Sequence, residues 1–359
     1  MITFFNSHLF LFILFVFLFV ITYFIHSYFY LRSHKFLIRK ANTNADRWAS
    51  QTKPILGGVT FLTSILIGTS IMYMLNIQPL MSQDMQTGLL LSIIFAFMMG
   101  LADDLLNTPP RFKFFVQLIV ATIFISSGVK INIFSDYWIN ISLTYIWVIG
   151  IMNSINMLDN MDAVNISVLS PILLFLMVFA TIFNSEINWL IIFLLPAMLS
   201  FFIFNWHPSK MYMGDNGSQL LGIAVAGIAI LYFWNHRHTP VYFSQDVSFL
   251  LIYLAFLVPI TDTTTVTTNR LLRGQSPFKG GRDHTTHFLV YRGFTERQTA
   301  LILMGISIIT NLFASLILFG ILTPTLPLKI GLWTFGLTIS LLLYLNTKLT
   351  KIPQAKTYE

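Results

Sequence analysis

Apolar residues run along this chain in long blocks, and short polar segments separate one block from the next. A helix needs about 20 mainly apolar residues to cross a bilayer, and lipid accepts no exposed irregular backbone. The pattern therefore predicts an all-α, polytopic membrane bundle of about eleven spanning helices, with ten as the alternative count. The predicted spans are residues 8–29, 57–75, 87–102, 113–128, 137–158, 164–184, 189–206, 217–234, 247–269, 298–322 and 329–347.

The first apolar block differs from a cleaved secretory signal, because no basic residue precedes it and no small-residue cleavage site follows it. We interpret it as an anchor helix. We expect residues 1–359 to form a single integral membrane domain, in which residues 270–297 are the longest cytoplasmic loop.

The composition supports this class of protein. Of the 359 residues 55% are hydrophobic and only 10% are charged, whereas soluble domains average about 25% charged residues. A soluble globular enzyme and a disordered chain are therefore excluded. Cysteine is absent, which excludes disulfides and thiolate metal sites.

The positive charges predict the orientation of the bundle. With the amino terminus outside, the inner segments hold 18 of the 21 lysines and arginines, and the outer side holds Lys130, Arg237 and Lys329. The positive-inside rule then places the carboxy terminus in the cytoplasm. Topology thus accounts for the net charge of +7, and no nucleic-acid partner is expected.

The acidic residues predict where chemistry takes place. Asp84, Asp136, Glu186 and Asp246 fall singly in short outer loops and are interpreted as solvated turn residues. A carboxylate at membrane depth costs at least about 2–3 kcal/mol, so such a group usually faces a cavity, a cation or a basic partner. On the inner side six carboxylates are drawn from several connections and helices, which predicts a polar site at the cytoplasmic face: Asp103, Asp104, Asp159, Asp162, Asp215 and Asp262.

Three inner segments give this site its predicted chemistry. The adjacent charges of Asp103 and Asp104 repel each other, so a divalent cation or a lysine is expected beside them, although a helix end facing water is the simpler alternative. Residues 153–162 place Asn156 and Asp159 one helical turn apart, in a polar stripe suited to a nucleotide or a metal. Residues 205–218 form a polar loop that leads into a helix amino terminus, which is a natural anion site.

The loop at residues 270–297 is rich in arginine and histidine, and binding to anionic lipid is the simplest interpretation of it. The glycine pair before Arg282, followed by His284 and His287, favours a shaped anion site. These two histidines lack a third ligand at suitable spacing, so zinc is not expected there. His8, His26 and His34 are interpreted as interfacial or core residues, and His236 and His238 as outer-loop residues without a motif.

In their order along the chain, these segments resemble the polyprenyl-phosphate N-acetylhexosamine-1-phosphate transferase family of glycosyltransferase 4 type. The resemblance runs from about residue 47 to residue 297. It rests on residues 52–58, on Asp103-Asp104 with Pro109, Lys113 and Gln117 after them, on residues 153–162 and 213–218, and on Asp262 with Arg270 and the loop ending at His287. Five weak motifs in order, all on the predicted cytoplasmic face, make a specific signal.

The resemblance implies transfer of a sugar 1-phosphate from a UDP-sugar to undecaprenyl phosphate, with release of UMP and with Mg²⁺, or alternatively Mn²⁺, as cofactor. It implies Asp215, Asp103 and Asp104 as metal ligands and Asp103, Asp104 and Asp159 as catalytic residues. Substrate contacts are implied for Lys53, Asn156, Asp162, Arg282, His284 and His287. The implied place is the bacterial cytoplasmic (inner) membrane, at the first membrane step of cell-envelope polysaccharide synthesis, such as lipopolysaccharide or O-antigen; a homodimer is an open alternative.

Two departures from the family pattern affect these expectations. Asn160 and Ala163 stand where the family often has glycine, which would stiffen that loop. The sparse histidine run favours the N-acetylglucosamine branch over the phospho-N-acetylmuramoyl-pentapeptide branch, which stays an alternative. A secondary transporter, a CDP-alcohol phosphotransferase and a non-catalytic scaffold are weaker alternatives, because the acids gather at one face from separate helices.

Overall fold

The computed structural model describes residues 2–32, 53–77, 81–183, 189–236, 243–277 and 280–351, with side chains from residue 9 onward. Over these ranges the chain is helical apart from loops and one isolated bridge between Ile55 and Tyr212. The helices in chain order are α1 (Ile2–Leu31), α2 (Gly57–Met74), α3 (Gln83–Leu106), α4 (Pro110–Ser126), α5 (Tyr137–Leu158), α6 (Val164–Ile182), α7 (Trp189–Asn205), α8 (Gly214–Ala229) with the π-helix η2 (Ile230–Trp234), α9 (Gln245–Ala255), α10 (Leu257–Leu272), α11 (Thr285–Tyr291), α12 (Glu296–Leu318) and α13 (Leu326–Leu349).

The polytopic membrane bundle expected from the sequence is confirmed, and each predicted apolar segment corresponds to helix. Among the described residues, eight helices are long and apolar enough to cross a membrane, or nine if α9 and α10 together form one span. The apolar helix α7 is shorter, at 17 residues. The span count of eleven and the orientation therefore stay predictions.

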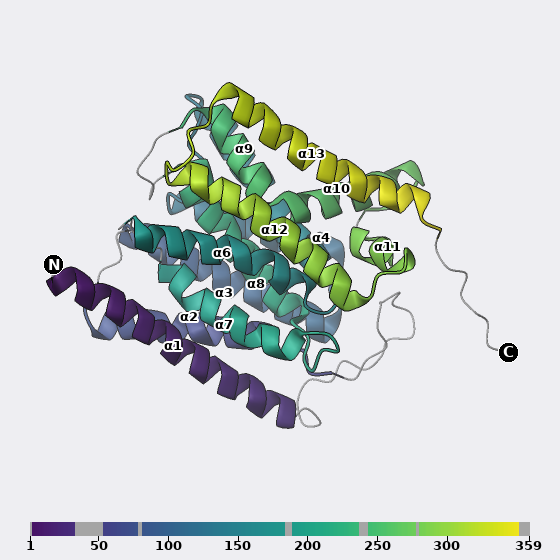
Figure 1. Ribbon diagram of the computed structural model, residues 1–359. Coiled ribbons are helices and arrows are strands. Elements are labelled where there is room, and N and C mark those ends of the chain that lie inside the picture. Colours follow the sequence, from purple (N-terminus) through teal and green to yellow (C-terminus); the bar gives the residue numbers. More distant parts are fainter. Residues whose placement is uncertain are drawn as a thin grey trace.

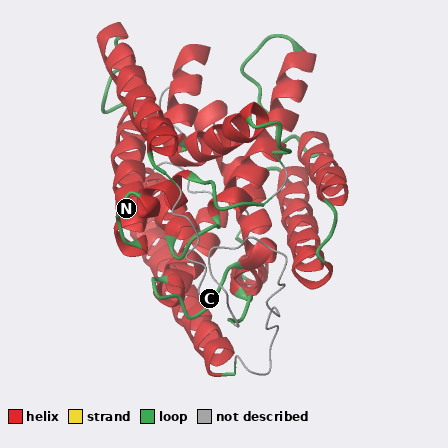
Figure 2. Ribbon diagram, turned by 90° about the vertical axis from the view of Figure 1, so that its right-hand side faces the viewer, coloured by secondary structure: helices red, strands yellow, loops and turns green. Residues whose placement is uncertain are grey.

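The helices form a layered bundle around α8, with α1 along one edge and α13 along the opposite edge (Figure 1). The segment Gly214–Trp234 is buried along its whole apolar window, whereas α1 and α13 expose most of theirs. A helix that is apolar all round is expected inside a bundle, and α8 packs there against α2, α3 and α5. Figure 2, which is turned by 90° from the view of Figure 1, shows the loops that join the ends of the helices.

The prediction of one continuous span at residues 247–269 is wrong. The chain breaks after Ala255, and α9 and α10 meet at an angle of 80°. Pro259 lies in the first turn of α10, where proline is tolerated because that turn has no intrahelical partner for its N–H. The break brings polar residues of α10, such as Asp262 and Arg270, to the loop of α11.

Two predicted outer residues have partners in the structure; His236 is buried, whereas Asp246 is exposed, as expected. His236 is 4% exposed, and its Nε2 lies 3.3 Å from the Ser248 hydroxyl. Asp246 pairs with Lys329 at 2.6 Å. His26 is a core residue, as expected, with its ring nitrogens at Ser200 Oγ (2.8 Å) and Thr60 Oγ1 (2.6 Å). The side chain of His8 and all of His34, Glu186, Arg237 and His238 lie outside the described residues.

Candidate active site

Three carboxylates and one lysine meet where α3 ends and where α4 and α8 begin. We call Asp103, Asp104, Lys113 and Asp215 the aspartate–lysine cluster. Lys113 Nζ lies 2.5 Å from Asp103 Oδ2 and 3.0 Å from Asp215 Oδ2. The other oxygen of Asp103 accepts hydrogen bonds from the backbone N–H and the hydroxyl of Thr108, at 2.8 and 2.7 Å. The sequence predicts a divalent cation or a lysine beside the adjacent aspartates, and the structure shows a lysine that joins Asp103 to Asp215, which is distant in the sequence.

Asp104 points instead at the amino terminus of α8. Its carboxylate accepts hydrogen bonds from the backbone N–H of Asp215 (3.1 Å) and of Asn216 (3.0 Å), and from the Asn216 side-chain amide (2.6 Å). The first amides of a helix lack intrahelical acceptors and carry partial positive charge, so a carboxylate stabilises them. The predicted anion site at this helix end is thus filled by Asp104 of another helix.

Glycines let the backbones come close enough for this contact. A Cβ on Gly100 would lie 2.2 Å from the carbonyl oxygen of Asp215 and 2.5 Å from Asn216 Cα. Gly214 has φ of +79°, in the left-handed region that glycine adopts without steric cost. The meeting of α3 and α8 at Gly100 therefore fixes the place of the aspartate–lysine cluster.

A layer of amides lies next to this cluster. Gln117 of α4 and Asn153 of α5 exchange hydrogen bonds at 2.9 and 3.3 Å, and Gln117 also donates to Gln219 of α8. One turn further along α5, Asn156 donates to Ser218 Oγ at 2.8 Å. Reciprocal amide bonds of this kind set the relative rotation of three helices, and so the position of the acids at their ends.

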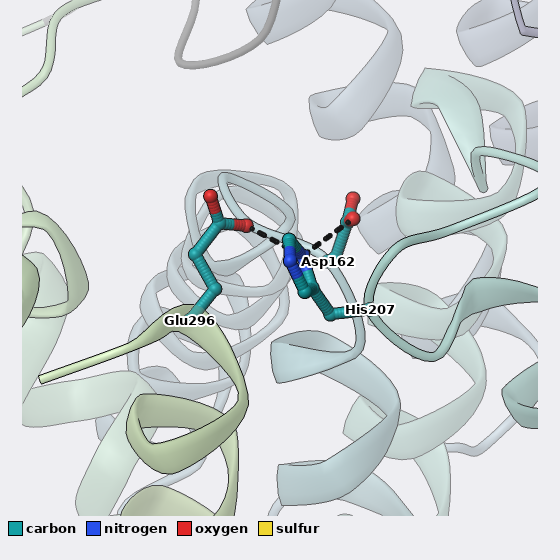
Figure 3. Close-up of side chains that lie close together, drawn as sticks. All are labelled: Asp162, His207 and Glu296. Carbon is teal, nitrogen blue, oxygen red and sulfur yellow. Dashed lines mark hydrogen bonds and ion pairs between the residues drawn. The ribbon is translucent and has the colours of Figure 1, made fainter.

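A second group, which we call the loop cluster, comprises Asp162, His207, Ser209 and Glu296. Asp162 is 9% exposed and accepts hydrogen bonds from the backbone N–H (2.9 Å) and hydroxyl (2.8 Å) of Ser209. His207 Nδ1 lies 3.1 Å from Asp162 and 3.0 Å from Glu296 (Figure 3). Lys53 Nζ donates to Ser209 Oγ at 3.1 Å and lies over the Tyr212 ring. Burial lowers the pKa of Lys53 despite the neighbouring carboxylates.

A third group surrounds α11. His284 Nδ1 lies 2.8 Å from Asp262, which also accepts bonds from the backbone N–H and hydroxyl of Thr285. Arg270 binds Asp283 through two nitrogens, at 2.9 and 2.6 Å. Burial would raise the pKa of Asp283, but the bonds from Arg270 hold it below its usual value.

His287 lies beside His284, with its Nδ1 3.3 Å from the His284 N–H. Burial lowers the pKa of His287 from 6.5 to about 3, so this imidazole is neutral at physiological pH. His287 can therefore offer a hydrogen bond to a phosphate, but it brings no positive charge.

Known proteins include several that are similar to this chain. Residues 86–233 match the model of glycosyl transferase family 4, a stretch that holds Asp103, Lys113, Asp162 and Asp215. A "Probable undecaprenyl-phosphate N-acetylglucosaminyl 1-phosphate transferase" of Bacillus subtilis is 26% identical over 275 residues, which cover 73% of this chain and 72% of that protein. The chain therefore resembles glycosyl transferase family 4 over residues 86–233. A phospho-N-acetylmuramoyl-pentapeptide-transferase of Staphylococcus saprophyticus is 27% identical over 288 residues, or 72% of this chain and 83% of that protein.

The predicted site residues fall into the three groups. Asp103, Asp104 and Asp215 meet directly, and Asn156 reaches them through Ser218, whose hydroxyl lies 3.4 Å from the Asp215 carbonyl oxygen. Lys53 and Asp162 share Ser209. His284 and His287 lie together beside Asp262. Arg282, in the loop before them, is exposed, and Asp159 caps the end of α5. Thr286 joins the third group to α5 through Asn160 at 2.6 Å.

Sequence reasoning did not assign site roles to several residues that the structure places here. In the sequence Lys113 stands out only as part of a motif, yet the structure places its ammonium between two carboxylates. His207 and Glu296 carry no local signal of their shared position, because they come from distant parts of the chain. The one sign in the sequence was the compact polar loop around His207.

Ala163 bears on the expected stiffness of this region. It has φ of +64° and is fully buried, and its N–H donates to the Asn205 side chain at 3.0 Å. An alanine thus adopts the left-handed conformation at a position where the family often has glycine. Such a conformation costs an L-residue about 1–2 kcal/mol.

Proposed function

We propose that this protein transfers an N-acetylhexosamine 1-phosphate from a UDP-sugar to undecaprenyl phosphate and releases UMP, with N-acetylglucosamine as the sugar. The observation that carries the proposal is the aspartate–lysine cluster at one end of the bundle. Both substrates are anionic, so their reaction needs cationic groups that neutralise and align the phosphates. The names of the two relatives both describe transferases, and that of the Bacillus protein includes undecaprenyl phosphate.

The donors in the aspartate–lysine cluster fit Mg²⁺. Asp103 and Asp215 already hold one cation between them, the Lys113 ammonium, and carboxylate oxygens are the ligands that Mg²⁺ prefers. We assign Asp215 as the principal ligand, assisted by Asp103 and Asp104, with Mn²⁺ as the alternative ion. When bound, the ion would neutralise phosphate oxygens as charge shifts to the leaving UMP.

The chain's own residues then position the phosphates. Lys113, displaced from one carboxylate, can turn its ammonium to a phosphate oxygen. Asn156 and Asp159 would hold the nucleotide, and Lys53, His284 and His287 would hold phosphates, with Arg282 at the rim. Asp103 or Asp104 could act as a base, but a phosphate monoester has a second pKa near 6 and is mostly dianionic at neutral pH. Positioning is therefore the role we assign to the pair.

The proposed step balances as a phosphoryl transfer. An oxygen of the lipid phosphate attacks the β-phosphorus of the UDP-sugar, and the bond between that phosphorus and the bridging oxygen breaks. The sugar keeps its own phosphate and joins the lipid in a pyrophosphate, and UMP leaves. We place this reaction at the cytoplasmic face of the bacterial inner membrane, where it would begin the synthesis of an envelope polysaccharide.

A second candidate is transfer of phospho-N-acetylmuramoyl-pentapeptide. The similar identity of the Staphylococcus relative supports it, while the sparse histidine run of this chain favours the first candidate. The two differ only in the sugar nucleotide, and the lipid acceptor can be the same.

A panel of UDP-sugars distinguishes the candidates. Purified protein with undecaprenyl phosphate and Mg²⁺ is expected to release UMP with UDP-N-acetylglucosamine or another simple UDP-N-acetylhexosamine. Release only with the muramoyl-pentapeptide nucleotide would establish the second candidate. Absence of release with every nucleotide, from protein that remains folded, would refute both.

A further inference from the structure

The loop cluster brings together a histidine and two carboxylates from three separate parts of the chain. Asp162 lies between α5 and α6, His207 lies between α7 and α8, and Glu296 is the first residue of α12. Figure 3 shows the imidazole between the two carboxylates, and the ligand atoms of the three residues all lie within 4.8 Å of one another.

The two carboxylates converge on the same nitrogen of the imidazole. His207 Nδ1 is 3.1 Å from Asp162 Oδ2 and 3.0 Å from Glu296 Oε2. One ring nitrogen carries at most one proton, and a single proton makes a well-aligned hydrogen bond to only one acceptor. A cation placed among the three atoms would interact with both carboxylates at once.

We propose that Asp162, His207 and Glu296 form a binding site for a divalent transition-metal ion of the zinc class. Metal–ligand bonds of about 2.1 Å put neighbouring ligand atoms about 3.0 Å apart at right angles and about 3.4 Å apart at tetrahedral angles. The two separations from His207 Nδ1, 3.0 and 3.1 Å, lie within a few tenths of an ångström of these values, and the two carboxylate oxygens lie within 4.8 Å of each other. One imidazole with two carboxylates suits zinc better than Mg²⁺, which prefers oxygen ligands.

The surroundings hold the ligands in place, as a metal site requires. Ser209 orients Asp162 with two hydrogen bonds, and Arg297 donates to the His207 carbonyl oxygen at 2.9 Å. Lys53 is another nearby cation, and its ammonium donates to Ser209 Oγ. In this assignment Asp162 holds the metal rather than the substrate.

The site has a structural consequence. A metal bound there would link the α5–α6 loop and the first residue of α12 to the loop between α7 and α8. That loop continues through Tyr212 to Asp215. This inference concerns metal binding and does not depend on the transferase activity, because its readouts are metal content and chemical protection.

The test uses the full chain, purified with an affinity tag that contains no histidine and dialysed against Zn²⁺ in excess Mg²⁺. We expect one zinc ion per chain for the wild type and for Asp215→Asn, whose substitution leaves the loop cluster intact. His207→Gln and Glu296→Gln should each weaken zinc binding by at least about tenfold. Asp246→Asn, which removes a carboxylate from an ion pair elsewhere in the bundle, is the matched control and should bind as the wild type does.

A second measurement uses only the wild type, so it does not depend on whether the variants fold. In the wild type, Zn²⁺ should slow modification of His207 by diethyl pyrocarbonate, as mapped by mass spectrometry, while Mg²⁺ alone should not. Absence of bound zinc in the wild type, zinc binding unchanged in both variants, or modification of His207 unaffected by Zn²⁺ would each overturn the proposal.

Discussion

At the scale of single residues, Lys113 connects two carboxylates of the aspartate–lysine cluster that come from different helices. Its ammonium lies between Asp103 and Asp215, each of which would otherwise face another negative charge. It also competes for these carboxylates with any divalent cation. The same side chain should therefore affect cofactor affinity and turnover in opposite directions.

Lys113→Gln is accordingly expected to lower the Mg²⁺ concentration needed for half-maximal activity, because two carboxylates lose their competing cation. The maximal rate should fall about 100-fold or more, since a positive charge near the phosphates is lost. Steady-state rates over a Mg²⁺ titration measure both effects. Arg111→Gln removes an exposed charge from the same helical turn and should change neither quantity; a rise in the Mg²⁺ requirement of Lys113→Gln would contradict the assignment.

His287 gives a prediction about pH. Its pKa is about 3 in the folded protein, against an ordinary value of 6.5, so the unfolded chain binds more protons between these values. The contribution of His287 to stability is therefore present above about pH 6.5 and is lost as the pH falls toward 3. The unfolding midpoint of His287→Gln, measured from pH 7.5 to pH 4.5, should fall less steeply than that of the wild type; equal slopes would contradict the burial of a neutral imidazole.

At the scale of elements, the approach of α3 to α8 decides where the acids meet. Gly100→Ala would place a methyl group 2.2 Å from the Asp215 carbonyl oxygen, so the two helices must separate. We expect a loss of stability of about 1–3 kcal/mol, as for other overpacked positions, and a large loss of activity. Thermal unfolding and turnover measure the two effects.

Gly150→Ala is the matched control, because a Cβ at this helical glycine of α5 meets no atom within 4 Å. Alanine favours a helix over glycine by about 1 kcal/mol, so this variant should be as stable as the wild type or more so. Equal behaviour of the two variants would show that the contact at Gly100 is not tight.

The sequence allowed the helices to be predicted far better than their contacts. A long apolar block predicts a membrane helix without any knowledge of the segments that pack against it. Each predicted segment therefore corresponds to helix. The break between Ala255 and Leu257 carries no such signal, since both sides are apolar. The direction of Asp104 toward α8 and the meeting of His207 with Glu296 depend on packing between distant segments, which a linear pattern does not encode.

At the scale of the whole molecule, the charge pattern predicts which end of the bundle faces the cytoplasm. The chain contains no cysteine, so single cysteines can report topology directly. In intact cells, a membrane-impermeant maleimide should label Ser244→Cys, whereas Arg273→Cys should react only after permeabilisation; both side chains are exposed. The reverse pattern would contradict the predicted orientation and would place the candidate active site outside.

The central claim is that the sugar travels with its phosphate, and one labelling experiment tests it most directly. UDP-N-acetylglucosamine carrying a radioactive β-phosphate is mixed with undecaprenyl phosphate, Mg²⁺ and the purified protein, with Asp215→Asn as the inactive control. Our account predicts that the label moves into the lipid fraction in equal amount to the unlabelled UMP released. Label that remains in the nucleotide as UDP while the sugar moves to the lipid would contradict it.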